Sequence, residues 1–139
     1  MSFSIPFLFI LDRIYIRNFW LRQKKLRTDI NMQSAPHFIA RLKYLTSNEG
    51  GRKTAAYSGY RPHIKFEGSN YLTSGQQVFI GADMVNPGES IDAEITIIAT
   101  HVFKNYLYPG LKFHFAEGPR IIGTGEIIKV LDKSLEKVE

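Results

Sequence analysis

Residues 110–131, GLKFHFAEGPRIIGTGEIIKVL, contain two strand-like patterns on either side of one tight turn. In the first pattern, apolar side chains alternate with polar or small ones, as in a strand with one buried face. A Gly-Pro pair at 118–119 supplies the turn. The second pattern is rich in Ile and Val and contains Gly123 and Gly125. Glycine inside a strand indicates a bulge, a sharp bend or a close approach of the backbone.

The same alternation recurs upstream in three further stretches, at residues 38–44, 63–67 and 91–97, and the short run at 77–80 adds one more strand. Turn residues separate these stretches, at Gly50-Gly51, Ser58-Gly59, Ser74-Gly75, Asn86-Pro87-Gly88 and Pro109-Gly110. About six strands and no clear helix after residue 37 predict an all-β domain, either a small antiparallel barrel or a sandwich. Closure of the sheet into a barrel would remove its exposed edges.

Size and composition indicate one soluble globular domain. The chain has 139 residues, of which 44% are hydrophobic and 22% charged. It contains no cysteine, which excludes disulfides, thiolate nucleophiles and Cys-ligated metals. The net charge is +5, but six basic and two acidic side chains give residues 1–31 a charge of +4. The remaining residues, with 12 basic and 11 acidic groups, are close to neutral.

Residues 1–36 differ from the rest and are expected to form a basic, amphipathic extension, with a short helix at residues 12–26. The apolar run at 3–11 is too short for a membrane span, which needs about 20 residues. No secretory signal is evident, and we expect a cytoplasmic protein. The extension is either an anchor on a membrane surface or RNA, or a loosely held segment, even one translated from a start upstream of Met32. The charged tail, 133–139, is expected to fray or to form one helical turn.

The motifs of the common enzyme classes are missing. The two Lys-Ser/Thr pairs, at 53–54 and 133–134, lack the preceding glycine of a phosphate-binding loop. No G-x-S-x-G elbow is present, and the four histidines lack metal-ligand spacing. We therefore expect a protein that is not an enzyme and has no cofactor or metal.

The densest polar constellation is EGGRKT at 49–54 with GYRPH at 59–63, and EGPR at 117–120 repeats the combination of a small-residue turn and an arginine. Such loops present backbone amides and guanidinium groups to phosphates or to the carboxylates of another protein. The alternative is that they are hairpin turns with solvated charges. If the fold brings the loops together, they form one surface.

The order and spacing of these motifs resemble the C-terminal β-barrel domain of elongation factor Tu. The resemblance rests on EGGRKT (49–54), GYRPHIKF (59–66), MVNPGESIDAEITI (84–97), GLKFHFAEGPR (110–120) and IIGTGEIIKVL (121–131). It implies that residues 37–132 form a six-stranded antiparallel barrel.

The resemblance also implies site residues. Positions that face aminoacyl-tRNA in that family correspond to His63, Thr73, His101 and Gly118. Ala116 corresponds to a residue at the interface with the GTPase domain. We expect Ala116 to belong to an interface for a protein partner, together with Arg52, Tyr60, Arg61 and Arg120. This interface is expected on an open apolar face near Tyr60 and Ala116.

Several features depart from the family. No GTPase motif is present, so this chain is not expected to deliver aminoacyl-tRNA by itself. His63 replaces a glutamine, and Pro119 replaces a glycine, which removes one amide donor.

These features lead to two hypotheses. The first is a non-catalytic module of translation elongation that binds a protein of the translation machinery, either a GTPase domain or a factor. The alternative is direct binding of the tRNA backbone through Arg52, Lys53, Arg61, His63 and Lys65. Self-association through the bare face is also consistent with the pattern.

Overall fold

The computed structural model describes residues 35–138, and residues 36–138 belong to one compact unit. The helix expected in the N-terminal extension lies outside the described residues. Eight strands are present in the described part: β1 Phe38–Tyr44, β2 Ala56–Tyr57, β3 His63–Phe66, β4 Leu72–Phe79, β5 Met84–Val85, β6 Ser90–Ile97, β7 Lys112–Glu117 and β8 Arg120–Val130. Two 3₁₀ turns lie between strands, η2 Ser47–Glu49 and η3 Thr100–Val102, and a third, η4 Lys133–Leu135, follows β8.

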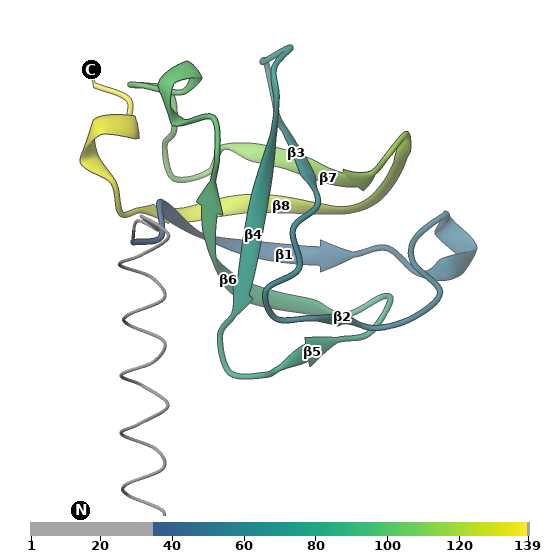
Figure 1. The fold of residues 1–139 in the computed structure, drawn as a ribbon. Coiled ribbons are helices and arrows are strands. Elements are labelled where there is room, and N and C mark those ends of the chain that lie inside the picture. The colour runs from purple at the N-terminus through teal and green to yellow at the C-terminus, as the bar shows by residue number, and fades with distance from the viewer. Residues whose placement is uncertain (1–34, 139) are drawn as a thin grey trace, which may run out of the picture. The chain divides into compact units, whose positions relative to one another are not determined.

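Six of the strands close into an antiparallel barrel in the order β1-β6-β4-β3-β7-β8, with β8 paired back to β1 (Figure 1). This confirms the predicted all-β barrel and decides between a barrel and a sandwich. The two remaining strands, β2 and β5, pair with each other as a small separate ribbon, which the sequence pattern did not predict.

Strand β4 is longer than predicted. It begins at Leu72 rather than at residue 77, and it includes Gly75, where we expected a turn. The reason is packing, because a Cβ at Gly75 would collide with the side chains of Ile64 and Ile95. The glycine therefore serves the interior of the barrel and not a reversal of the chain.

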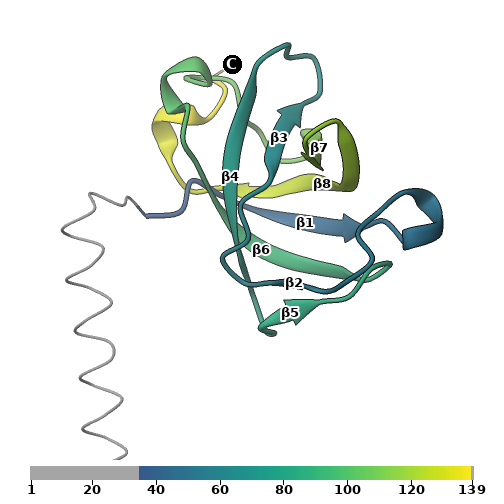
Figure 2. The same ribbon diagram turned by 45° about the vertical axis from the view of Figure 1, so that its right-hand side comes forward.

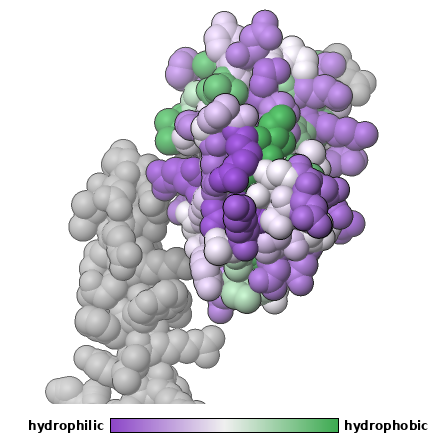
Figure 3. Space-filling model, turned by 90° about the vertical axis from the view of Figure 1, so that its right-hand side faces the viewer, coloured by the Kyte–Doolittle hydropathy of each residue, from purple (hydrophilic) through white to green (hydrophobic). Residues whose placement is uncertain are grey.

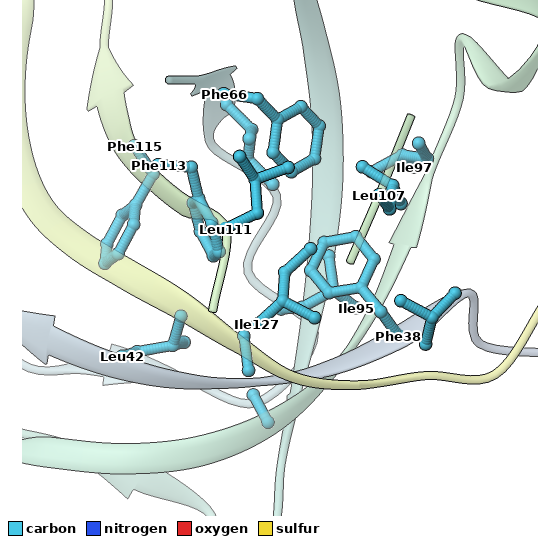
Figure 4. Close-up of a cluster of buried hydrophobic side chains, with 14 of the residues drawn as sticks. Phe38, Leu42, Phe66, Ile95, Ile97, Leu107, Leu111, Phe113, Phe115 and Ile127 are labelled. Atoms are coloured by element: carbon cyan, nitrogen blue, oxygen red, sulfur yellow. The ribbon is translucent and has the colours of Figure 1, made fainter. Parts of the chain in front are cut away.

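Aromatic and branched side chains fill the barrel (Figure 4). The rings of Phe38, Phe66 and Phe113 meet edge to face, with centroid separations of 5.6–6.0 Å. Two glycines in β8 leave space for the rings of β7. A Cβ at Gly125 would overlap the Phe113 ring, and a Cβ at Gly123 would overlap the Phe115 ring. Close approach is therefore observed at both glycines, and beside Gly123 the β7–β8 register also shifts, between Phe115 and Ala116, as at a bulge.

The turn and tail predictions are also informative. Residues 86–89 form the predicted turn: the Glu89 amide donates to the Asn86 carbonyl at 3.0 Å, and Gly88 has the positive φ of a type II turn. The tail forms a helical turn, η4, rather than fraying. Leu135 is fully buried, and its carbonyl accepts hydrogen bonds from the amides of Tyr106 and Leu107. Burial of this leucine contributes about 2 kcal/mol.

Candidate functional site

Two loops distant in sequence meet around one carboxylate. The Arg52 Nη1 and the Tyr60 hydroxyl both donate to Glu117 Oε2. Arg120 Nη2 lies 3.3 Å from the other oxygen, Glu117 Oε1. We name Arg52, Tyr60, Glu117 and Arg120 the Glu117 cluster. It confirms that the loop at 49–54 and the turn at 117–120 form one surface.

Local structure holds the Arg52 side of the cluster in place. A capping box on η2 fixes the start of the loop, because the Glu49 amide and the Thr46 amide each bond to the other residue's side chain, at 3.2 and 2.8 Å. Gly51 is required next, since a Cβ there would collide with the Leu45 carbonyl. The Arg52 guanidinium also donates to the Ala55 carbonyl at 3.1 Å. Arg52 is thus fixed from two directions.

The Glu117 side is supplied by the β7–β8 hairpin (Figure 2). Glu117 and Arg120 are paired across a two-residue turn, and Gly118 at its first position has φ +57°. A hairpin turn with glycine at this position is of type II′, which matches the twist of the strands. The hairpin therefore places Glu117 and Arg120 on one short rigid element.

Electrostatics favour an ionised carboxylate in the cluster. Partial burial raises the pKa of Glu117, but hydrogen bonds from Tyr60 and Arg52 outweigh it and hold this pKa below its usual value. Burial, together with the hydrogen bond to Glu117, raises the pKa of Tyr60. At neutral pH, Tyr60 is consequently a hydroxyl donor and Glu117 an acceptor. The Arg52 guanidinium lies over the Tyr60 ring, 4.9 Å from its centroid.

A buried polar pair supports the cluster from inside the barrel. The Tyr44 hydroxyl donates to Gln77 Oε1, and burial raises the pKa of Tyr44. The backbone of Gln77 also binds the segment next to the cluster. Its main-chain N–H donates to the Tyr60 carbonyl at 2.8 Å, and its main-chain carbonyl accepts from the Gly59 N–H at 2.7 Å. The backbone of Tyr60 is therefore anchored to β4.

Other predicted site residues lie close to this cluster. Ala116 precedes Glu117 and is paired with His63 across β7 and β3. His63, Arg61 and Gly118 are exposed. These residues extend the same end of the barrel, so the structure groups most of the predicted partner interface with two of the four positions assigned to RNA.

The other two residues predicted to face RNA, Thr73 and His101, lie outside this group. Thr73 is only 5% exposed, and its hydroxyl accepts a hydrogen bond from the Ala99 amide at 3.0 Å. Its side chain ties β4 to the segment before η3. His101 is exposed on η3, which lies away from the β7–β8 hairpin (Figure 1).

The expectation of an open apolar face near Tyr60 and Ala116 needs correction. Both residues are half-buried, and the Tyr60 ring is covered by Arg52 and bonded through its hydroxyl to Glu117. The face of the molecule that carries these loops is mostly hydrophilic, with small hydrophobic areas (Figure 3). The exposed apolar side chains near the cluster are Tyr57 and Ile121, which are 64% and 43% exposed.

Glu117 is the central residue that sequence reasoning missed. It was assigned to a turn and not to a site, because its partners lie 57 and 65 residues away. The available signal was weak: Glu117 lies three residues before Arg120, one of the arginines assigned to the interface.

Two further properties of the described part of the chain bear on function. Among residues 35–138, no group of three or more acidic or histidine side chains is arranged to hold a metal ion. None of the helical turns in this part has the length and hydropathy of a membrane-spanning helix.

Comparison with known protein families matches residues 31–131 to the elongation factor Tu C-terminal domain. The match spans more than half of the chain and the whole barrel up to the end of β8. The chain therefore belongs to this family, whose domain is the non-catalytic C-terminal domain of the factor. The family relates the chain to translation elongation.

Proposed function

We propose that this member of the elongation factor Tu C-terminal domain family is a non-catalytic binding module, acting in the cytoplasm, that docks on a protein of the translation machinery through the Glu117 cluster and its surroundings. The partner is a GTPase domain or a factor. The observation that carries the proposal is the joining of two distant loops by Glu117.

The chemistry of the cluster favours a protein partner over a phosphate backbone. Arginine and tyrosine are enriched among the residues that dominate protein interfaces. Glu117 already neutralises part of the charge of Arg52 and Arg120, and it would repel a phosphate. Exposed apolar side chains at Tyr57 and Ile121 flank the cluster and supply area that a protein can bury. A second copy of this chain is one protein that could bury it.

Direct tRNA backbone binding is the second candidate, favoured by one specific observation. Gly118 lies at the exposed tip of the hairpin, and nothing lies within 4 Å of a Cβ built there. The backbone can thus approach a ribose or phosphate closely, with the exposed Arg61 and His63 nearby. Pro119 weakens this candidate because it has no amide to donate.

Affinity capture tests the proposal. The full chain is immobilised, exposed to a nuclease-treated lysate, and the captured proteins are identified by mass spectrometry. The comparison variant is Arg61→Glu/Arg120→Glu, and the charge-matched control is Lys129→Glu/Lys133→Glu, at exposed positions outside the cluster.

We expect a translation GTPase or factor to be captured by the natural chain and the control, and to be lost with the arginine variant. Equal capture by all three chains, or capture of no translation protein, would refute the proposal. Capture that occurs only in a parallel lysate without nuclease, where tRNA is intact, and that declines steeply with salt would favour the second candidate. Elution as a dimer during size-exclusion chromatography, abolished by the arginine variant, would identify a second copy as the partner.

A further inference from the structure

The outer face of β4 carries no charge. Residues 68–82, which include the whole strand, contain no Asp, Glu, Lys or Arg. Because side chains alternate along a strand and every second residue of β4 from Thr73 to Phe79 is buried, the others point away from the core. These outward residues are Leu72, Ser74, Gln76 and Val78, and Ile80 continues the series just after the strand. The strand runs along the front of the barrel in Figures 1 and 2.

Apolar side chains are exposed at both ends of this face. At one end, Leu72 and Ile98 are 61% and 65% exposed. The Ile98 amide donates to the Ser74 carbonyl at 3.2 Å, so Ile98 lies level with Ser74 and is a diagonal neighbour of Leu72. At the other end, Val78 and Ile80 are exposed. Exposed apolar side chains gathered on one face are a mark of a binding surface.

Two charges of opposite sign flank the face, one at each end. Lys65 on β3 is paired with Leu72, and Glu94 on β6 is paired with Val78. Both side chains point outward, because their chain neighbours on either side are buried. Among residues 35–138, neither Lys65 nor Glu94 has an oppositely charged side chain within ion-pair distance.

The other charges near this face have different neighbours. Asp92, the next outward residue on β6, is bound to Arg41, with Oδ1 2.7 Å from Nε. Glu67 follows β3 and lies across from Lys112, to whose carbonyl the Glu67 amide donates at 2.8 Å. Lys65 and Glu94 are therefore the uncompensated charges beside the face of β4.

A second copy of this chain fits such a face better than a membrane or a nucleic acid does. A positive and a negative group on one face are self-complementary, because a two-fold axis between them places Lys65 of each copy against Glu94 of the other. Ile98 lies between the two charges along the strand direction, so the same axis buries it near the centre of the contact. An anionic membrane or a phosphate backbone would be repelled by Glu94 instead.

We propose that this chain forms a two-fold symmetric dimer through the outer face of β4, with Ile98 near its centre and Lys65 of each copy paired with Glu94 of the other. This interface shares no residue with the Glu117 cluster and does not rest on the function proposed above. Its apolar side chains are few, so the dimer belongs with small interfaces and dissociates on dilution.

Sedimentation velocity of the full chain over a roughly hundredfold range of concentration tests the dimer. Lys65→Glu and Glu94→Lys should each weaken self-association about tenfold or more, because either change places like charges together at both symmetric contacts. Mixed with each other, the two variants should associate again, since each supplies the charge that the other has lost. Lys133→Glu makes the same charge change as Lys65→Glu at an exposed position on η4, and it should stay within about twofold of the natural chain.

A second pair of variants tests the apolar centre. Ile98→Glu should abolish self-association, because it places two carboxylates near the two-fold axis. Val138→Glu introduces the same charge at an exposed apolar position in the tail and should leave the dimer intact. Thermal unfolding verifies that each variant is folded.

Three results would overturn the dimer proposal: a natural chain that is monomeric over the whole range, a dimer that survives Ile98→Glu, or charge variants that fail to associate when mixed. A dimer abolished only by Arg61→Glu/Arg120→Glu would place the second copy on the Glu117 cluster instead. A monomer that sediments with vesicles of phosphatidylcholine and phosphatidylserine, and loses this binding in Ile98→Glu, would assign the face to a membrane. None of these results depends on capture of a translation protein, so the two proposals can fail separately.

Discussion

The body and the tip of the β7–β8 hairpin are stabilised in opposite ways. In the body, Phe113 faces Gly125 and Phe115 faces Gly123, so two rings cover two glycines within a single pair of strands. At the tip, Glu117 binds side chains from a loop more than 50 residues earlier in the chain. The body depends on apolar packing between near neighbours, whereas the tip depends on charged groups brought together by the closed barrel.

This contrast separates stability from recognition. Apolar packing in the body involves no ionisable group, and it fixes the direction of the hairpin. The tip is partly exposed, so its ion pairs contribute modestly to folding. Its value lies in presenting guanidinium, hydroxyl and carboxylate groups in one geometry. We therefore expect substitutions in the body to affect stability, and substitutions at the tip to affect binding.

The largest effect is expected from truncation of a ring in the body. Phe113→Ala removes a side chain that is 4% exposed and contacts the rings of Phe38 and Phe66. It should lower the free energy of unfolding by about 3–5 kcal/mol, through lost burial and a cavity. Chemical denaturation monitored by circular dichroism measures this change. A loss below about 1 kcal/mol would mean that the ring is not part of a close-packed core.

The next effect concerns the glycine beneath that ring. In Gly125→Ala the new methyl group would overlap the Phe113 ring, and we expect a destabilisation of about 1–3 kcal/mol. In the Phe113→Ala background the overlap is gone, and alanine should instead gain about 0.5–1 kcal/mol over glycine. A double-mutant cycle in chemical denaturation measures this coupling. Additive effects would show that ring and glycine are independent.

The body was predictable because its signals are local. The alternation at residues 111–115 and the glycines at 123 and 125 are visible in the sequence, and the barrel required only that each run pair with its neighbours. β4 was predicted five residues short, because Gly75 was assigned to a turn when its role is to admit Ile64 and Ile95. A glycine needed for a turn and one needed for packing look identical in a sequence.

The tip was predictable only in part. The two loops were identified by composition, but the choice of Glu117 as their link depends on barrel closure, which no local pattern encodes. Thr73 illustrates the same limit, because the burial of its hydroxyl as an acceptor for the Ala99 amide depends on the barrel and is not visible in the sequence.

A smaller effect on stability is expected at the tip. Glu117→Gln keeps the size of the side chain and removes its charge, so Arg52 and Arg120 lose their ionic partner. Because this side chain is 29% exposed, solvent limits the loss of unfolding free energy to about 1 kcal/mol. Chemical denaturation measures it, with Glu126→Gln on the outer wall as a matched control. A loss as large as that of Phe113→Ala would contradict the division between body and tip.

The smallest effect is the pH dependence of the difference in unfolding free energy between the natural chain and Glu117→Gln. The pKa of Glu117 is lower in the folded protein than its usual 4.5, so the folded state favours the ionised carboxylate. Its contribution to stability is therefore complete above the usual pKa, and it is lost as pH falls through the lowered, folded value. Unfolding free energies of the natural chain and of Glu117→Gln should differ at neutral pH and converge in acid. A difference that persists unchanged below the folded pKa would mean that the charge of Glu117 is not what joins the two loops.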